Sequence, residues 1–119
     1  MLLTMLQSKL HRVRVTHAHL HYEGSCGIDT RLLEASGIRE FQSIDVYNIC
    51  NGARFSTYVI AAPAGSGEIS LNGAAARKAM IGDLLIIASY INIAESELNP
   101  WRPRIVFVDD DNRPASATP

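Results

Sequence analysis

Cysteine is scarce in this chain, with only Cys26 and Cys50 among 119 residues. Two thiols form one bridge at most, which excludes a small scaffold held by several disulfides and favours reduced thiols. Long apolar runs are lacking as well, and the longest, "LLIIASYINIA", is too short to cross a bilayer. The first residues, "MLLTMLQSKLHRVR", place apolar side chains before the cations, the reverse of a secretion signal. We therefore expect a cytoplasmic protein with no membrane segment.

Charge is also in short supply, since charged residues make up 19% of the chain and the net charge is −1. This balance gives no reason to expect a nucleic-acid partner, because such proteins usually carry a basic excess. The first 22 residues contain cations and all four histidines but no acid, which suits a small anionic ligand. Apolar residues make up 47% of a chain whose small size leaves much of its surface exposed, so we expect a homo-oligomer that covers part of this apolar surface.

Short strands and turns dominate the rest of the pattern. Six or seven strands and two short helices, with connections mostly too short for crossover helices, favour a single mainly β domain built as a small barrel. One predicted helix, "DTRLLEASG", begins at Asp29 or Thr30 and ends at Gly37, and the other is "AAARKAM". The polar tail from about residue 109 to residue 119 is predicted to be disordered.

The first predicted strand is "KLHRVRVTHAHLHY". Side chains alternate between the two faces of a strand, so a regular strand puts Lys9 and His11 on the same face as Val13 and Val15. Lys9 and His11 are therefore expected to share the valine face.

A hairpin is predicted around Asn51-Gly52, a pair that is typical of two-residue loops. In that register Cys50 pairs with Ala53, and the pairing continues outwards along both strands. Arg54 and Tyr58 then point to the same face of the hairpin, because they are separated by an even number of residues.

Three histidines alternate in "HAHLH" at positions 17, 19 and 21. In a strand they point the same way and form a comb that can bind a transition metal. Metal sites usually take ligands from separate segments, and no partner motif accompanies the comb, so a solvated strand face is the favoured interpretation. The lone "GSG" at residues 65–67 similarly predicts a turn rather than a phosphate site, since it lacks a strand-to-helix context.

The run "HYEGSCGI" at residues 21–28 contains two potential nucleophiles, Ser25 and Cys26. Cys26 as the thiol of a hydrolase, with His11 or His21 as base, is one hypothesis. Packing in the core is the commoner fate of such a cysteine.

Ser25 supports a different hypothesis, because a serine hydroxyl can attack the carbonyl of the preceding residue and convert the amide into an ester. That carbonyl must be uncrowded and the backbone distorted, and Gly24 suits both conditions. Elimination and hydrolysis then turn Ser25 into a pyruvoyl group at a new chain start. Gly-Ser pairs are common turns, so the pair alone is a weak signal.

The surrounding sequence strengthens the self-cleavage hypothesis for Gly24-Ser25. Residues 4–29, "TMLQSKLHRVRVTHAHLHYEGSCGID", are followed by "NGARFSTYVIAA" at 51–62 and "GSGEISLNGAAAR" at 65–77. These segments, in this order, resemble the pyruvoyl-dependent aspartate 1-decarboxylases, and the resemblance extends to about residue 108. The combination of "HYEGS", "RFSTY" and "NGAAAR" is highly specific to that family.

The resemblance implies a proenzyme that cleaves itself between Gly24 and Ser25 into a β chain, residues 1–24, and an α chain, residues 25–119. It implies a double-psi β-barrel assembled as a homotetramer, with active sites between neighbouring subunits. It also implies that L-aspartate is decarboxylated to β-alanine and CO₂ for pantothenate and coenzyme A biosynthesis. The pyruvoyl group forms a Schiff base with the substrate, so neither a metal nor pyridoxal phosphate is expected.

Roles for individual residues follow from the same resemblance. Arg54, with Lys9, is expected to bind a substrate carboxylate, and a guanidinium suits that task because it binds carboxylates bidentately. Tyr58 is expected to donate the proton that replaces CO₂. Thr57 is expected to hydrogen-bond the Gly24 carbonyl during cleavage and to line the substrate site. The expected substrate-binding loop consists of Asn72, Gly73, Ala74 and Ala75.

Two positions depart from the family pattern: His19 stands where Asp is common, and Ile81 stands where proline is common. His19 puts the rate of self-cleavage in question. Whether cleavage is spontaneous or needs an accessory activator stays open. Two alternatives remain, a non-catalytic barrel that binds nucleic acid through residues 9–14, and the Cys26 hydrolase.

Overall fold

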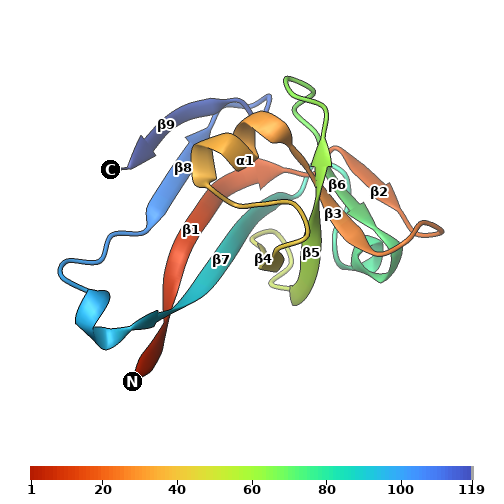
Figure 1. Ribbon diagram of the computed structural model, residues 1–119. Coiled ribbons are helices and arrows are strands. Elements are labelled where there is room, and N and C mark those ends of the chain that lie inside the picture. Colours follow the sequence, from red (N-terminus) through yellow and green to blue (C-terminus); the bar gives the residue numbers. More distant parts are fainter. Residues whose placement is uncertain (119) are drawn as a thin grey trace.

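The computed structural model describes residues 1–118, which form a strongly curved β-structure with short helices (Figure 1). In chain order the strands are β1 (Leu2–Arg14), β2 (His17–His19), β3 (Ser25–Asp29), β4 (Ser43–Asn48), β5 (Arg54–Ala62), β6 (Ile69–Asn72), β7 (Leu84–Ala94), β8 (Arg104–Val108) and β9 (Pro114–Thr118). The helices are α1 (Thr30–Ser36) and the 3₁₀ helices η1 (Gly73–Lys78) and η2 (Glu95–Glu97). The prediction of a mainly β fold with short helices is confirmed, although the described residues form nine strands rather than six or seven.

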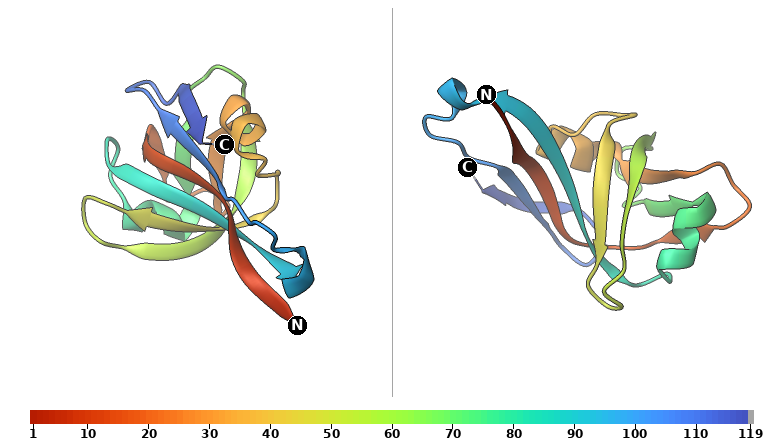
Figure 2. Two further views of the ribbon diagram at one scale, coloured as in Figure 1. Left: turned by 90° about the vertical axis from the view of Figure 1, so that its left-hand side faces the viewer. Right: turned by 90° about the horizontal axis from the view of Figure 1, so that it is seen from below.

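The sheet order is β2-β6-β3-β5-β4-β7-β1-β8-β9, a mixed arrangement in which β3 lies between antiparallel β6 and parallel β5. The long strands β1 and β7 pair along most of their length, and β2, β3 and β6 gather at one end of the molecule (Figures 1 and 2). Helix α1 packs beside β1 and β8. The largest fully buried side chains come from α1 and from strands on both sides of the sheet's centre, β3 and β6 on one side and β1 and β7 on the other; they include Leu10, Ile28, Leu32, Ile69, Leu71 and Ile87.

Strand β1 contains a bulge at Arg12, which has a φ of 66° and no partner in the register with β7. The extra residue reverses the alternation of faces, so Leu10 and Val13 are both fully buried. Lys9 and His11 are only half-buried and lie on the face opposite Leu10. The prediction that Lys9 and His11 share the valine face is therefore wrong.

The hairpin of β4 and β5 has a longer loop than predicted. Tyr47 pairs with Arg54, and the Asn48 amide donates to the Ala53 carbonyl. The Asn48 side chain accepts from the Cys50 amide, which organises the loop. The Cys50–Ala53 pairing is wrong by two residues, but a shift of two keeps every side chain on its face. Arg54, Ser56 and Tyr58 accordingly alternate with more buried residues, as predicted.

Helix α1 begins and ends where the sequence predicts, with Asp29 as its N-cap and Gly37 in the left-handed conformation after its last turn. The Asp29 carboxylate is fully buried and accepts from the amides of Arg31, Gly65 and Gly67. Burial alone raises the pKa of a carboxyl group, but these three amides and the Arg31 charge hold the pKa of Asp29 below its ordinary value. The "GSG" turn thus binds an anion of its own chain.

The expectation of a disordered tail is wrong for residues 109–118, which form a turn and strand β9 paired with β8. In the turn, the buried Asn112 side chain accepts from the Arg14 amide and donates to the carbonyls of Arg14 and Gly67. Composition suggested disorder because the tail has little apolar surface to bury, whereas these hydrogen bonds anchor it. The last residue lies outside the described part of the chain.

Replacing Asp29 by asparagine should lower the free energy of unfolding by about 1–3 kcal/mol at neutral pH, because a buried charged acceptor of three amides is lost. Urea denaturation measures this change. Asp110→Asn, at an exposed carboxylate, is the matched control and should leave stability unchanged. An Asp29→Asn protein as stable as wild type would contradict the account.

The stability that Asp29 contributes depends on pH, and it decreases as the pH falls. The folded-state pKa of Asp29 is lowered, so its stabilising contribution is present above the unfolded pKa of about 3.9 and is lost as the pH falls through the folded value. The difference between wild type and Asp29→Asn should therefore shrink below about pH 4.

Candidate active site

Ser25 is the first residue of β3, a strand whose five residues are all buried. Ser25 itself is 4% exposed and lies opposite Asn72 in the antiparallel register with β6. Asn72 Nδ2 donates a hydrogen bond of 2.9 Å to Ser25 Oγ. The hydroxyl is therefore largely buried and held by β6, directly after Gly24.

Gly73 brings the β6 backbone against the peptide segment that precedes Ser25. A Cβ on Gly73 would lie 3.0 Å from Gly24 Cα, Gly24 N and Tyr22 O, and Gly73 has a φ of 69°. Both observations favour glycine at this position, because a Cβ would press on the neighbouring backbone and residues with side chains rarely adopt the left-handed conformation. Gly24 has the opposite environment, since a Cβ there would meet no atom within 4 Å.

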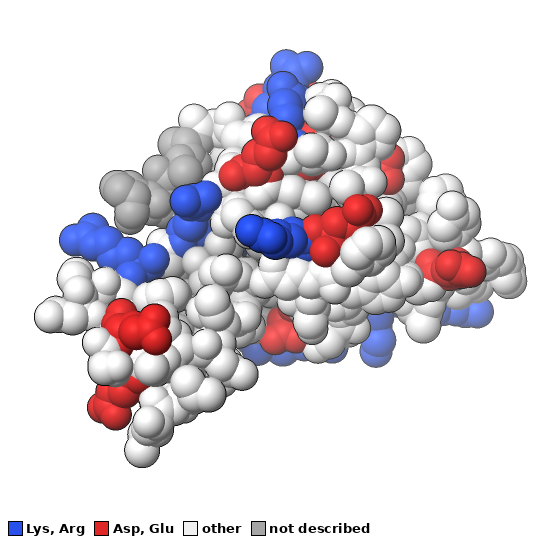
Figure 3. Space-filling model, in the orientation of Figure 1, with Lys and Arg blue, Asp and Glu red and all other residues white. Residues whose placement is uncertain are grey.

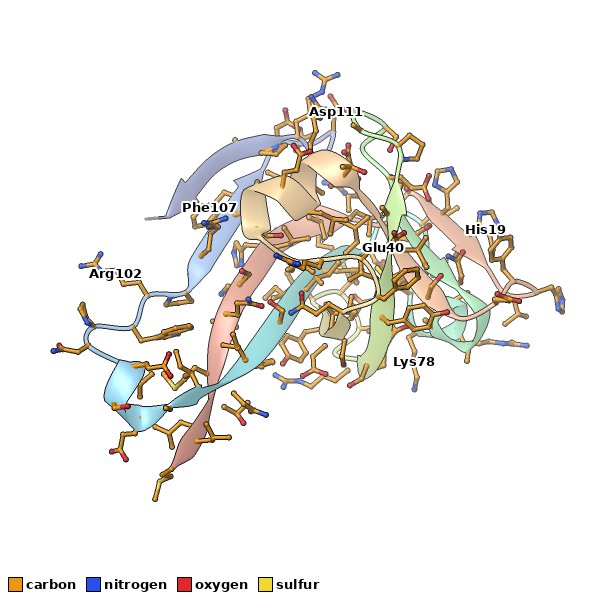
Figure 4. The ribbon with its side chains drawn as sticks, in the orientation of Figure 1. His19, Glu40, Lys78, Arg102, Phe107 and Asp111 are labelled. Carbon is orange, nitrogen blue, oxygen red and sulfur yellow. The ribbon has the colours of Figure 1, made fainter. Side chains whose placement is uncertain are left out.

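Two cavities open beside this segment, and Gly24 and Asn72 line both of them. The larger is about 410 Å³, and its walls include His19, Tyr22, Ser25, Tyr58, Glu68 and Ser70. The smaller is about 200 Å³, and its walls include Phe55, Thr57, Ala74, Ala75 and Lys78. His19 and Lys78 lie toward the same end of the molecule, near β2 and β6 (Figure 4).

Most of the residues expected in a site are brought together here. Thr57 and Tyr58 are neighbours on β5 and face different cavities, each shared with Gly24. The expected group comprises Gly24, Ser25, Thr57, Tyr58, Asn72, Gly73, Ala74 and Ala75. Asn72 and Gly73, which the resemblance assigned to substrate binding, contact the segment around Ser25 directly.

Lys9 and Arg54 do not join this group within one chain. Arg54 precedes Tyr58 by four residues on β5, a separation of about 13 Å along a strand. Lys9 lies on β1, opposite Ala88, which in turn lies opposite Asp45 on β4. The register therefore places Lys9 and Arg54 on one outer face of the sheet, formed by β5, β4, β7 and β1.

The outer face holds Arg54 through an aromatic contact. The Arg54 guanidinium lies over the Tyr47 ring, 4.4 Å from its centroid, and the Tyr47 hydroxyl is 2.8 Å from the Tyr90 hydroxyl. Sequence reasoning missed both tyrosines, because the two residues are far apart in the chain and meet only through the pairing of β4 with β7.

The family model described as aspartate decarboxylase matches residues 1–115. The chain belongs to the aspartate decarboxylase family. The resemblance predicted from the sequence is thereby confirmed.

Proteins named aspartate 1-decarboxylase are similar over most of their length. The one from Methylobacillus flagellatus is 63% identical over 110 residues, covering 92% of this chain and 87% of that protein. The one from Bordetella avium is 61% identical over 109 residues, covering 92% of this chain and 89% of that protein. The one from Methylococcus capsulatus is 56% identical over 110 residues, covering 92% of this chain and 87% of that protein.

Glu68 and Ser70 add polar groups to the larger cavity of this family member. The Ser70 hydroxyl donates to Glu68 Oε2 at 2.9 Å, and a Cβ on Gly27 would collide with Ser70 Oγ. The spacing in "EISLN" carries the signal, because alternate residues of an extended chain point the same way, and Ser70 and Asn72 of β6 follow Glu68 at this spacing. Sequence reasoning examined position 72 alone and missed the other two.

The histidine comb is a surface feature. The rings of His17 and His19 stack with centroids 5.8 Å apart, and both residues are exposed. Within residues 1–118, no three or more His, Cys, Asp or Glu side chains are grouped to hold a metal ion. No helix in that range is long and apolar enough to span a membrane.

The nucleic-acid alternative gains no support from the face of the molecule shown in Figure 3. Lys and Arg side chains are interspersed with Asp and Glu side chains on the face shown in Figure 3, and no continuous basic stripe crosses it. Binding to a phosphate backbone usually requires such a basic patch.

The hydrolase alternative fails on the environment of Cys26. Its side chain is fully buried in the core, and burial, followed by the charge of Glu68, raises the pKa of the thiol to about 12. A reactive cysteine needs an accessible thiolate near neutral pH, and Cys26 has neither property.

In the folded protein, iodoacetamide at pH 8 should therefore modify the exposed Cys50 and spare Cys26. Peptide mass spectrometry locates the adduct. Denatured protein is the control and should be modified at both cysteines. Modification of folded Cys26 at a rate close to that of Cys50 would restore the thiol hypothesis.

Proposed function

We propose that this protein decarboxylates L-aspartate to β-alanine and CO₂, supplying β-alanine for pantothenate and coenzyme A biosynthesis, after cleaving its own chain between Gly24 and Ser25. The activity follows the names of the relatives. The observation that supports the cleavage is that two consecutive residues contact the Gly24-Ser25 link, Asn72 at the Ser25 hydroxyl and Gly73 at the Gly24 backbone.

The local geometry suits attack by the serine hydroxyl on the Gly24 carbonyl carbon. In that step the Oγ–C bond forms, the amide C–N bond breaks, and the hydroxyl proton passes to the nitrogen of Ser25. The Asn72 hydrogen bond orients Oγ, and the absence of a Cβ on Gly24 leaves the carbonyl uncrowded. Thr57 lines a cavity that Gly24 also lines, and its hydroxyl is proposed to donate to the carbonyl oxygen as charge develops there.

The ester then undergoes β-elimination, which separates the two chains. The α-proton of residue 25 is removed, the Gly24 carboxylate leaves, and water replaces the nitrogen, which departs as ammonia. The products are a β chain of residues 1–24, which ends in a carboxylate, and an α chain of residues 25–119, which begins with a pyruvoyl group. The larger cavity beside Ser25 provides room for the water and for the substrate.

The pyruvoyl ketone would supply a covalent link to the substrate amine and accept the electrons released with CO₂, so the proposed reaction uses neither a metal nor pyridoxal phosphate. Tyr58 is 39% exposed and lines the cavity that contains Ser25. Its hydroxyl is proposed to donate the proton to the substrate's α-carbon after CO₂ leaves. Asn72, Ala74 and Ala75 line the smaller cavity, which shares Gly24 and Asn72 with the larger one, and are proposed to contact the substrate.

The substrate carboxylate is proposed to bind Arg54 and Lys9 of a neighbouring copy in a homotetramer. Within one chain Arg54 is separated from Tyr58 by about 13 Å of strand, too far for one small dicarboxylate to bridge with residue 25. The outer face that carries Arg54 also exposes the aromatic side chain of Tyr90. A second copy covering this face would bury that side chain and complete the site.

The intact mass of purified protein tests the cleavage. Two fragments should be found, and the larger should be lighter by one ammonia molecule than a simple hydrolysis product beginning with serine. Ser25→Ala should remain one chain and be inactive, because the attacking oxygen is absent. Tyr58→Phe should be cleaved normally and produce no β-alanine.

A single full-length chain after prolonged incubation, both alone and with a cell extract, would count against self-cleavage. Cleavage only in the extract would indicate an accessory activator. Turnover by Tyr58→Phe would remove Tyr58 as the proton donor while leaving the cleavage intact.

Mixed assemblies test whether the site lies between copies. Ser25→Ala and Arg54→Ala proteins should each have little activity, since one lacks the reacting group and the other the carboxylate ligand. When the two chains are co-expressed with different tags, random assembly should restore about one quarter of the sites. An inactive mixed assembly would place both residues in one chain's site and contradict the shared arrangement.

A further inference from the structure

Arg54 has an arrangement on the outer face that the proposed reaction does not explain. It pairs directly with Tyr47 across β4 and β5, and its guanidinium covers the Tyr47 ring. Among residues 1–118 it has no carboxylate partner, and the Asp45 carboxylate on the same face accepts from Ser56 instead. The edge of the guanidinium is therefore free to bind a carboxylate from outside the chain.

Tyr47 is in turn held by Tyr90. Tyr47 lies opposite Ile86 on β7, and Tyr90 is four residues further along that strand. The two tyrosine side chains reach toward each other along the sheet, and their hydroxyl oxygens are 2.8 Å apart. The hydrogen bond to Tyr90, followed by burial, raises the pKa of Tyr47 to about 12.

We propose that Tyr47 and Tyr90 are positioning residues for the substrate reaction: their hydroxyl pair fixes the Tyr47 ring, and the ring fixes the Arg54 guanidinium toward an incoming carboxylate. The arginine side chain has many rotamers, and holding one of them before binding lowers the cost of ordering it on the substrate. The proposal rests on the proposed function, since it gives Arg54 the role of substrate ligand.

The effect should fall on substrate binding and not on the chemical step. Neither tyrosine hydroxyl lines the cavities around Ser25, so self-cleavage and kcat should keep their wild-type values. Loss of the hydroxyl pair should raise KM for L-aspartate about three- to tenfold, the range expected when one long side chain must be ordered on binding.

The experiment compares Tyr90→Phe, Tyr47→Phe and the double variant for self-cleavage, kcat and KM. Each single variant should be cleaved fully and raise KM at unchanged kcat. The double variant should be no worse than either single one, because both remove the same hydrogen bond. An unchanged KM for Tyr90→Phe, or additive effects of the two substitutions, would overturn the proposal.

Arg54 variants separate this proposal from the proposed function. Arg54→Ala should raise KM strongly, and adding Tyr90→Phe to it should change nothing further, because the group being positioned is gone. If Arg54→Ala leaves KM unchanged, the proposed carboxylate ligand is wrong. If Arg54→Ala raises KM but Tyr90→Phe raises it equally with or without Arg54, the tyrosines do not act through Arg54 and only the positioning proposal fails.

Discussion

The close approach of two backbones, at Gly73 and Gly24, is the constraint on which the candidate site depends. Gly73 has no side chain and a left-handed conformation, so β6 can turn directly against the segment that precedes β3. One residue earlier, Asn72 holds the Ser25 hydroxyl. A bond that would otherwise lie in a mobile loop is thereby fixed against a buried strand, with a cavity on each side. Holding the reacting groups in a fixed orientation can remove a large part of the activation free energy.

The fold supports this contact from both ends of β3. At the start of β3 the pairings with β5 and β6 bury Ser25, and at its end Asp29 caps α1 and binds the "GSG" loop that leads into β6. Strands β3 and β6 are therefore tied together at both ends. The outer face of β5, β4, β7 and β1 extends along β5 from Tyr58, which lines the larger cavity, to Arg54, which aromatic contacts hold. The proposed enzyme needs both Ser25 and Arg54, and an oligomer can bring them together.

The sequence predicted local features well, because the signals were local. Helix α1 was predicted from its caps, and the faces of β5 from alternation. Features that depend on distant partners were missed. The bulge at Arg12 changed the face of Lys9, and Asn112 ordered a tail whose composition suggested disorder. For the site, the family resemblance named the residues around Ser25, whereas the Tyr47–Tyr90 contact could be found only from the strand register.

Hydride trapping tests the central claim most directly. The purified protein is treated with sodium borohydride in the presence of L-aspartate, digested, and mapped by mass spectrometry. The account predicts substrate-derived mass at residue 25, at the start of the larger fragment, together with loss of decarboxylase activity. Substrate-derived mass on a lysine, or an active enzyme in which residue 25 is still an unmodified serine, would contradict it.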